Sequence, residues 1–90
     1  MKLHRYWFEF AKPIDKTYLI MGLGLGCGVT AYDLEDAMQV LQKHLFKVDI
    51  IPLIIKVIED VDIPTLDQLH VITNMGIPIE RGIWFPKGYE

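Results

Sequence analysis

Acidic residues and one histidine are concentrated in a short stretch in the second half of the chain. They are Glu59, Asp60, Asp62, Asp67 and His70. Carboxylates and an imidazole can serve as ligands of a cation, or as a general acid and base. The calcium-loop pattern, with its central glycine and terminal glutamate, is absent from the sequence. We therefore expect no metal site, and we interpret most of these carboxylates as solvated loop residues.

The spacing of three polar residues suggests a possible ligand site. Asp67 precedes His70 by three residues, and Asn74 follows His70 by four. On the short helix predicted for residues 66–71, Asp67 and His70 share one face, so the carboxylate of Asp67 can orient the imidazole of His70, and Asn74 lies in the turn that follows. A nucleophile is harder to find, because the chain has no serine and its one cysteine, Cys27, is predicted on an apolar strand face. We expect no catalytic residue.

Glycine occupies every even position from 22 to 28. The run does not fit the dinucleotide motif G-x-G-x-x-G, because Cys27 and Val29 stand where its third glycine would be required. The Gly-Lys-Ser/Thr phosphate loop is also absent, so no nucleotide cofactor is expected. On a strand, the run has one apolar face and one bare face, which a neighbouring aromatic such as Trp7 should cover. In the alternative, a ligand or the backbone of a partner approaches the bare face closely.

Charge is unevenly distributed along the chain. Nine Lys and Arg residues oppose twelve Asp and Glu residues, which gives a net charge of −3. Residues 17–42 and 57–79 contain no lysine or arginine. No strong basic patch exists to neutralise phosphates, so nucleic acid is not an expected partner. An acidic surface would instead suit a basic protein.

The first half of the chain contains the elements that should position these residues. Alternation predicts a strand over residues 4–11, and a second extended run from residue 17 through the glycines to residue 31. Asp33 should cap a helix, because apolar residues recur at helical spacing from position 34 to position 45.

The second half adds two predicted strands, over residues 54–61 and 77–85, and a short helix over residues 66–71. The order is therefore β-β-α-β-short helix-β. Strands grouped around one helix favour a single α+β domain over residues 1–90. We expect one antiparallel sheet of about four strands, with the main helix packed on one face.

Two adjacent aromatic residues, Trp84 and Phe85, end the last predicted strand. Alternation predicts that they face opposite sides of the sheet, which makes Trp84 a candidate for an exposed partner-binding anchor. In the alternative, Trp84 and Trp7 together cover the face of the sheet opposite the helix.

The single cysteine cannot form an intramolecular disulfide, which fits a reducing compartment. The N-terminal residues lack the apolar stretch of a secretory signal, and no apolar run is long enough to cross a bilayer. The expected location is the cytoplasm, without membrane association.

Several segments resemble those of other proteins. They are residues 5–10 (RYWFEF), 26–32 (GCGVTAY), 57–62 (VIEDVD), 70–76 (HVITNMG) and 81–86 (RGIWFP). Over nearly the whole chain they resemble a family of small, uncharacterised bacterial proteins, and this resemblance implies no activity and no site residue. As a class, the chain also resembles the small acidic immunity proteins with which bacteria neutralise toxin domains, many of them basic nucleases.

Two functional hypotheses follow. In the first, the chain is a non-enzymatic cytoplasmic immunity protein that binds a basic toxin domain, with partner-binding residues Glu59, Asp60, Asp62, Asp67 and Trp84. In the second, it is a small enzyme or ligand-binding domain with a site around Asp67, His70 and Asn74.

Overall fold

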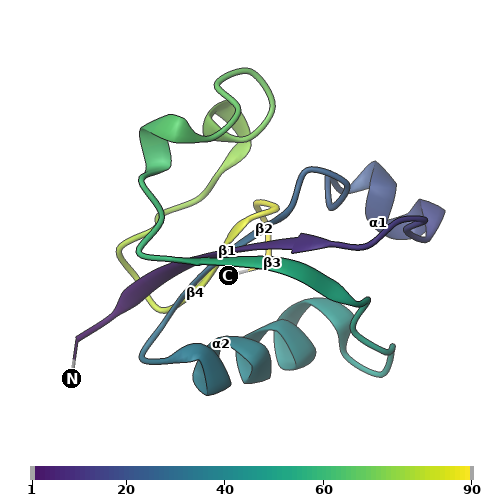
Figure 1. Cartoon of the computed structure of the whole chain (residues 1–90), viewed down its shortest axis with the longest axis horizontal. Coiled ribbons are helices and arrows are strands. Elements are labelled where there is room, and N and C mark those ends of the chain that lie inside the picture. The colour runs from purple at the N-terminus through teal and green to yellow at the C-terminus, as the bar shows by residue number, and fades with distance from the viewer. Residues whose placement is uncertain (1, 90) are drawn as a thin grey trace.

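A computed structural model describes residues 2–89. Its four antiparallel strands lie in the order β3-β1-β2-β4. They are β1 (His4–Phe10), β2 (Cys27–Ala31), β3 (Ile54–Glu59) and β4 (Gly82–Phe85). The main helix, α2 (Leu34–Leu41), continues as a π-helical turn (Gln42–Phe46) and covers one face of the sheet (Figure 1). The predicted α+β fold, a four-stranded antiparallel sheet with one main helix, is confirmed.

β1 is an interior strand that is covered on both faces. Tyr6, Phe8 and Phe10 face α2 and belong to the larger hydrophobic cluster. Trp7 points to the opposite face and belongs to a second cluster. All four side chains are buried, so the predicted strand carries core residues on both of its faces.

The helix begins where the sequence predicts. The side chain of Asp33 accepts a hydrogen bond from the backbone N–H of Asp36, with an N···O distance of 2.7 Å. This bond satisfies one of the N–H groups that a helix start leaves unpaired. Ala37, Val40 and Leu41 then lie buried against the sheet. Within residues 2–89, no helix has the length and apolar character needed to cross a membrane.

The chain between β3 and β4 forms the second layer, above the sheet in Figure 1. Val61 and Val71 from this segment are buried in the second cluster. The prediction of a helix over residues 66–71 is wrong. Two 3₁₀ turns, Ile63–Thr65 and Ile72–Asn74, flank these residues, which form a turn between them. The side chain of Asp67 accepts the backbone N–H groups of Leu69 and His70, which closes a local turn in place of a helix.

The predicted extended run from residue 17 to residue 31 is also wrong in its first half. A short helix, α1 (Lys16–Ile20), follows Asp15, whose carboxylate caps it by accepting the N–H of Thr17. Turns follow over residues 21–25, and β2 begins only at Cys27. Gly26 has a φ of 139°, a backbone conformation that side-chain-bearing residues rarely adopt.

β4 is shorter than the strand predicted over residues 77–85, and a bulge changes the direction of its aromatic side chains. Val29 pairs with Ile83 while Gly28 pairs with Phe85, so Trp84 is the extra residue of a bulge. The bulge places Trp84 and Phe85 in the same cluster, which contradicts the alternation that predicted opposite faces.

Candidate functional site

Trp84 is not available at the surface. Its relative exposure is 0%, and its ring stacks on Trp7 with a centroid separation of 5.9 Å. The proposed role as an exposed partner-binding anchor therefore does not fit the structure, whereas the alternative, in which the two tryptophans cover the face opposite the helix, does. The same rings cover the predicted bare strip, with Trp7 over Gly26 and Trp84 over Gly28.

Three side chains gather where β3 ends beside the start of β1. His4 Nδ1 lies 3.0 Å from both carboxylate oxygens of Asp60 and 3.7 Å from Oε1 of Glu59. Antiparallel pairing of β1 with β3 produces this contact between residues far apart in sequence. β3 ends at Glu59, and Asp60, with a φ of 52°, interrupts the regular pairing before Val61 N donates a last bond to the carbonyl of Arg5. No local sequence pattern around His4 predicts its contact with Asp60.

Hydrogen bonds set the charge state of this cluster. The bond with His4 is the main cause that holds the pKa of Asp60 below its usual value. Burial, followed by the nearby charge of Glu59, raises the pKa of Tyr6, whose hydroxyl donates to Glu59 over 3.4 Å. Asp60 is therefore ionised at neutral pH. Together with exposed Asp62, Glu59 and Asp60 form what we call the acidic end of β3.

The same three residues offer ligand atoms at metal-like spacing. One atom each from His4, Glu59 and Asp60 lies within 4.8 Å of the others. Glu59 and Asp60 are exposed, and His4 already binds Asp60. The hydrogen bonds between His4 and Asp60 account for this arrangement.

The second group of predicted site residues is brought together in the segment above the sheet. Asp67 accepts bonds from His70 twice, from its backbone N–H at 3.0 Å and from Nδ1 at 3.1 Å. The first of these bonds is the largest cause that lowers the pKa of Asp67. Asn74 Nδ2 donates to the carbonyl of His70 over 3.0 Å. Asp67 thereby orients the imidazole, and Nε2 has no hydrogen-bond partner within the described part of the chain.

A groove of about 490 Å³ runs beside His70. Its polar lining includes His70, Thr73 and Asn74. Most of its apolar lining comes from the end of α1 and the turns that follow it. The remaining lining residues are Ile20, Met21, Gly22, Leu25, Pro86 and Lys87. Sequence spacing found His70 and Asn74, but it gave no sign of Lys87 or of the apolar lining.

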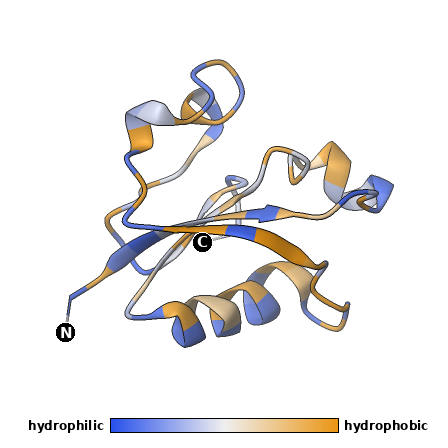
Figure 2. Cartoon of the chain, viewed as in Figure 1, coloured by the Kyte–Doolittle hydropathy of each residue, from blue (hydrophilic) through white to orange (hydrophobic). Residues whose placement is uncertain are grey.

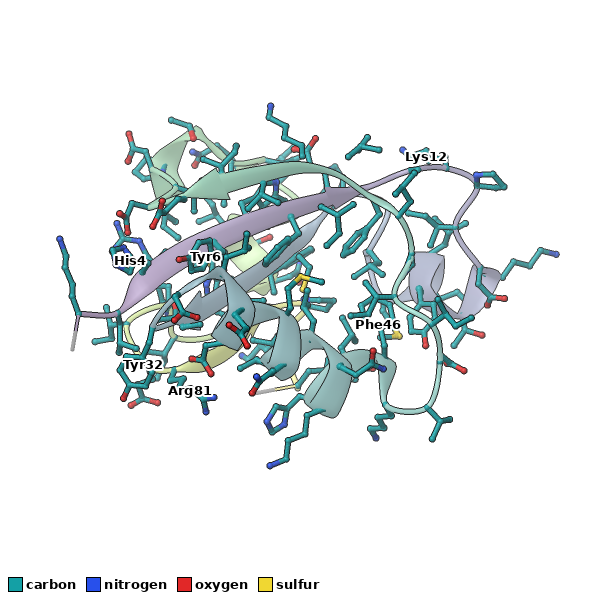
Figure 3. All side chains as sticks on the ribbon, turned by 60° about the horizontal axis from the view of Figure 1, so that its bottom comes forward. His4, Tyr6, Lys12, Tyr32, Phe46 and Arg81 are labelled. Carbon is teal, nitrogen blue, oxygen red and sulfur yellow. The ribbon has the colours of Figure 1, made fainter. Side chains whose placement is uncertain are left out.

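β3 itself presents a surface that sequence reasoning missed. It is the end strand of the sheet, and only β1 pairs with it. Figure 3 shows β3 along the upper margin of the sheet, with β1 below it. Ile55 is 64% exposed and Val57 is 41% exposed. In Figure 2 the strand is mostly hydrophobic and becomes hydrophilic where it ends.

Another polar cluster is structural. Arg81 donates from Nε and a terminal nitrogen to the two carboxylate oxygens of Asp36, over 2.9 and 2.5 Å. Its guanidinium lies 6.0 Å from the ring centroid of Tyr32, and Figure 3 shows the two side chains close together. This pair ties the segment before β4 to the start of α2. Arg81 also lowers the pKa of Asp36.

Comparison with known protein families, with curated proteins and with solved structures finds no match.

Proposed function

We propose that the chain is a non-enzymatic protein-binding domain that recognises a basic partner through the acidic end of β3. The observation that carries this proposal is that Glu59, Asp60 and Asp62 are exposed and lack a lysine or arginine partner among the described residues. Within residues 2–89, His4 alone among the basic side chains lies within 4.0 Å of the carboxylates of Glu59 and Asp60. Three exposed carboxylates without a lysine or arginine partner among the described residues can thus meet cationic groups of another molecule.

The partner class that best suits this surface is a basic toxin domain, such as a nuclease. Enzymes that bind nucleic acids carry basic surfaces that neutralise phosphates, and an acidic inhibitor can occupy such a surface. The net charge of −3 would speed the encounter. In this proposal the chain acts in the cytoplasm as an immunity protein. Asp67, from the same lysine-free stretch, extends its acidic surface.

Binding can be tested with the immobilised protein and the products of neighbouring genes. We expect retention of one basic protein at moderate salt and its release at high salt. The variant Glu59→Lys/Asp62→Lys should lose retention. The matched control Glu35→Lys/Glu80→Lys makes the same change in net charge at exposed positions outside the acidic end. Equal retention by both double variants would refute the proposed surface.

Inhibition is the second part of the test. Expression of the retained protein alone should stop bacterial growth, and co-expression with the wild-type chain should restore growth. The Glu59→Lys/Asp62→Lys variant should fail to restore it, while the control variant should succeed. A retained protein that is harmless when expressed alone would exclude the immunity role but would leave protein binding intact.

A second candidate function rests on the groove beside His70. The oriented imidazole, the amide of Asn74 and the ammonium of Lys87 all line one cavity with apolar side chains, an arrangement that suits a small anionic ligand with an apolar part. A screen of small carboxylates by protein-detected NMR would test it. We expect shifts at His70 and Asn74 that disappear in His70→Ala, with a nearly unchanged melting temperature. Shifts that survive in His70→Ala would exclude this site.

A further inference from the structure

We infer that the basic partner adds an extended segment to the sheet as a fifth strand on the outer edge of β3. This inference rests on the proposed function, because it specifies how the acidic end of β3 holds its partner. Three observations carry it: the direction of the backbone groups of β3, its exposed apolar side chains, and the order of its charges.

The first step establishes which backbone groups point outward. Ala11 N donates to the carbonyl of Leu53 over 2.8 Å, and Phe10 pairs with Ile54. A bond made one residue beyond a pair marks that pair as non-hydrogen-bonded in an antiparallel ladder. Phe10 therefore does not bond to β3, and alternation along β1 requires that Glu9 does.

Glu9 pairs with Lys56, and the pairing is regular from there to the end of β3. Lys56 and Ile58 consequently direct their N–H and C=O groups toward β1. Val57 and Glu59 direct theirs outward. Among the described residues, no backbone hydrogen bond beyond the β1 ladder reaches residues 54–59, and the side-chain bond to Glu59 comes from Tyr6 on β1, away from the outer edge. The outer edge is open for strand addition.

The side chains do not protect this edge. Edge strands usually avoid association through charges, proline, short length or a cover of other chain segments. β3 has six residues, and Lys56 is the only basic one among them. Leu53, Ile55 and Val57 are all exposed. These exposed apolar side chains lie next to the unpaired backbone groups of β3. An extended partner segment could cover the side chains and pair with the backbone groups at the same time.

The charges select the occupant. Val57 and Glu59 lie on the α2 face, opposite Phe8 and Tyr6, while Lys56 and Ile58 lie on the other face. An antiparallel segment would place basic residues opposite Asp60 and Glu59, apolar residues opposite Ile58 and Val57, and an acidic residue opposite Lys56. In chain order this is Lys-Arg-Val-Val-Glu. The complementary occupant is therefore an extended segment that is basic at its start and apolar after it.

The probe for the experiment is the blocked peptide Thr-Lys-Arg-Val-Val-Glu-Thr, added to isotope-labelled protein. In the free protein the amides of Val57 and Glu59 should exchange quickly with solvent, because they face water. Peptide should slow both by about tenfold or more. Lys56 and Ile58 serve as internal controls, since their amides bond to β1 throughout. A control peptide with Glu-Glu in place of Lys-Arg should bind about tenfold more weakly.

Two variants separate strand addition from simple charge attraction. Val57→Pro removes one outward N–H, at a position where an edge strand tolerates proline. Val57→Thr keeps that N–H together with a β-branched side chain. We expect peptide binding to be lost in Val57→Pro and retained in Val57→Thr. The amide-exchange result on wild-type protein is decisive if Val57→Pro fails to fold.

The outcomes distinguish this inference from the proposed function. Peptide binding that Glu59→Lys abolishes, but that leaves the amides of Val57 and Glu59 unprotected, would overturn strand addition while supporting the acidic site. Absence of peptide binding at millimolar concentration would overturn strand addition, while the retained basic protein would still test the acidic surface. A dimer in sedimentation, with both amides already protected, would also overturn the inference, because a second copy would then occupy the edge.

Discussion

The indole ring of Trp84 lies in the space that a side chain on Gly28 would require. Three of its ring atoms are 2.5 Å from the position of a β-carbon on that glycine. Gly28 belongs to β2 and Trp84 to the bulge in β4, so the missing side chain lets the tryptophan lie flat across the neighbouring strand. The second cluster is therefore built around a residue that contributes no side chain of its own.

Replacement of Gly28 by alanine should destabilise the protein. The new methyl group would overlap the ring of Trp84, which is fully buried and cannot move outward. We expect the free energy of unfolding to fall by about 1–3 kcal/mol. Urea denaturation followed by tryptophan fluorescence would measure the change.

Gly24→Ala is the matched control for this substitution. A β-carbon at that position would meet only the end of the Leu19 side chain, at 3.1 Å, and Leu19 is exposed enough to move. Its effect on unfolding should be much smaller. Equal losses in the two variants would show that the ring of Trp84 does not restrict Gly28.

Asp33→Ala should weaken the start of α2. The side chain loses the acceptor for the backbone N–H of Asp36, and such caps contribute about 1 kcal/mol. Asp33→Asn keeps an oxygen at the same place and should cost considerably less. Urea denaturation of the three proteins at neutral pH would compare them. A loss in Asp33→Asn as large as that in Asp33→Ala would contradict the capping role.

Tyr18 should give the protein an alkaline stability transition. Its hydroxyl donates a hydrogen bond to Asp49, and this bond, together with burial, raises the pKa of Tyr18 to about 12. The unfolded chain ionises near pH 10. The contribution of the bond is therefore fully present below about pH 10, and it is lost as the pH rises toward about 12, because the unfolded state loses its proton first.

Tyr18→Phe removes this contribution at every pH. The difference in unfolding free energy between wild type and Tyr18→Phe should therefore be largest near pH 8 and should shrink above about pH 10. Urea midpoints across this range would measure it. A difference that grows with pH would contradict the assigned hydrogen bond.

Cys27 should react only when the protein unfolds. Its side chain has 0% exposure, and burial raises the pKa of its thiol. Iodoacetamide should label native protein more slowly than urea-unfolded protein, by a factor of about 10³ or more. The reason is that the unfolded fraction of the native sample is about 10⁻³ or less. Mass spectrometry would follow the reaction. Rapid labelling of the native protein would show that the thiol is accessible.

The sequence was informative where signals are local. Asp33 and the apolar repeat after it define α2 correctly, because capping and periodicity act within a few turns. The turn that joins Asp67 to His70 also depends on near neighbours. The glycine run was ambiguous, because glycine at every second position fits both a strand and a series of turns. The positive φ of Gly22 and Gly26 favours turns at those positions.

Long-range features had no comparable signal. The contact between His4 and Asp60 spans 56 positions, and it exists only because β1 pairs with β3. The open edge likewise depends on the strand order, which the local pattern of residues 54–59 does not encode. The bulge that buries Trp84 arises from pairing with β2. Both the exposed edge and the burial of Trp84 are therefore properties of the assembled sheet.

The interior position of β1 has a consequence for synthesis. β1 emerges from the ribosome well before β3, one of its two neighbours, because β3 is made from residues 54–59. Until those residues emerge, the nascent chain displays an aromatic strand with an unpaired edge, which is a strong template for aggregation. Pairing of β3 with β1 removes this exposed edge. The edge that then faces solvent at this end of the sheet is that of β3, which has no aromatic residue and ends in Glu59. In the folded protein the aromatic strand β1 is therefore paired on both sides.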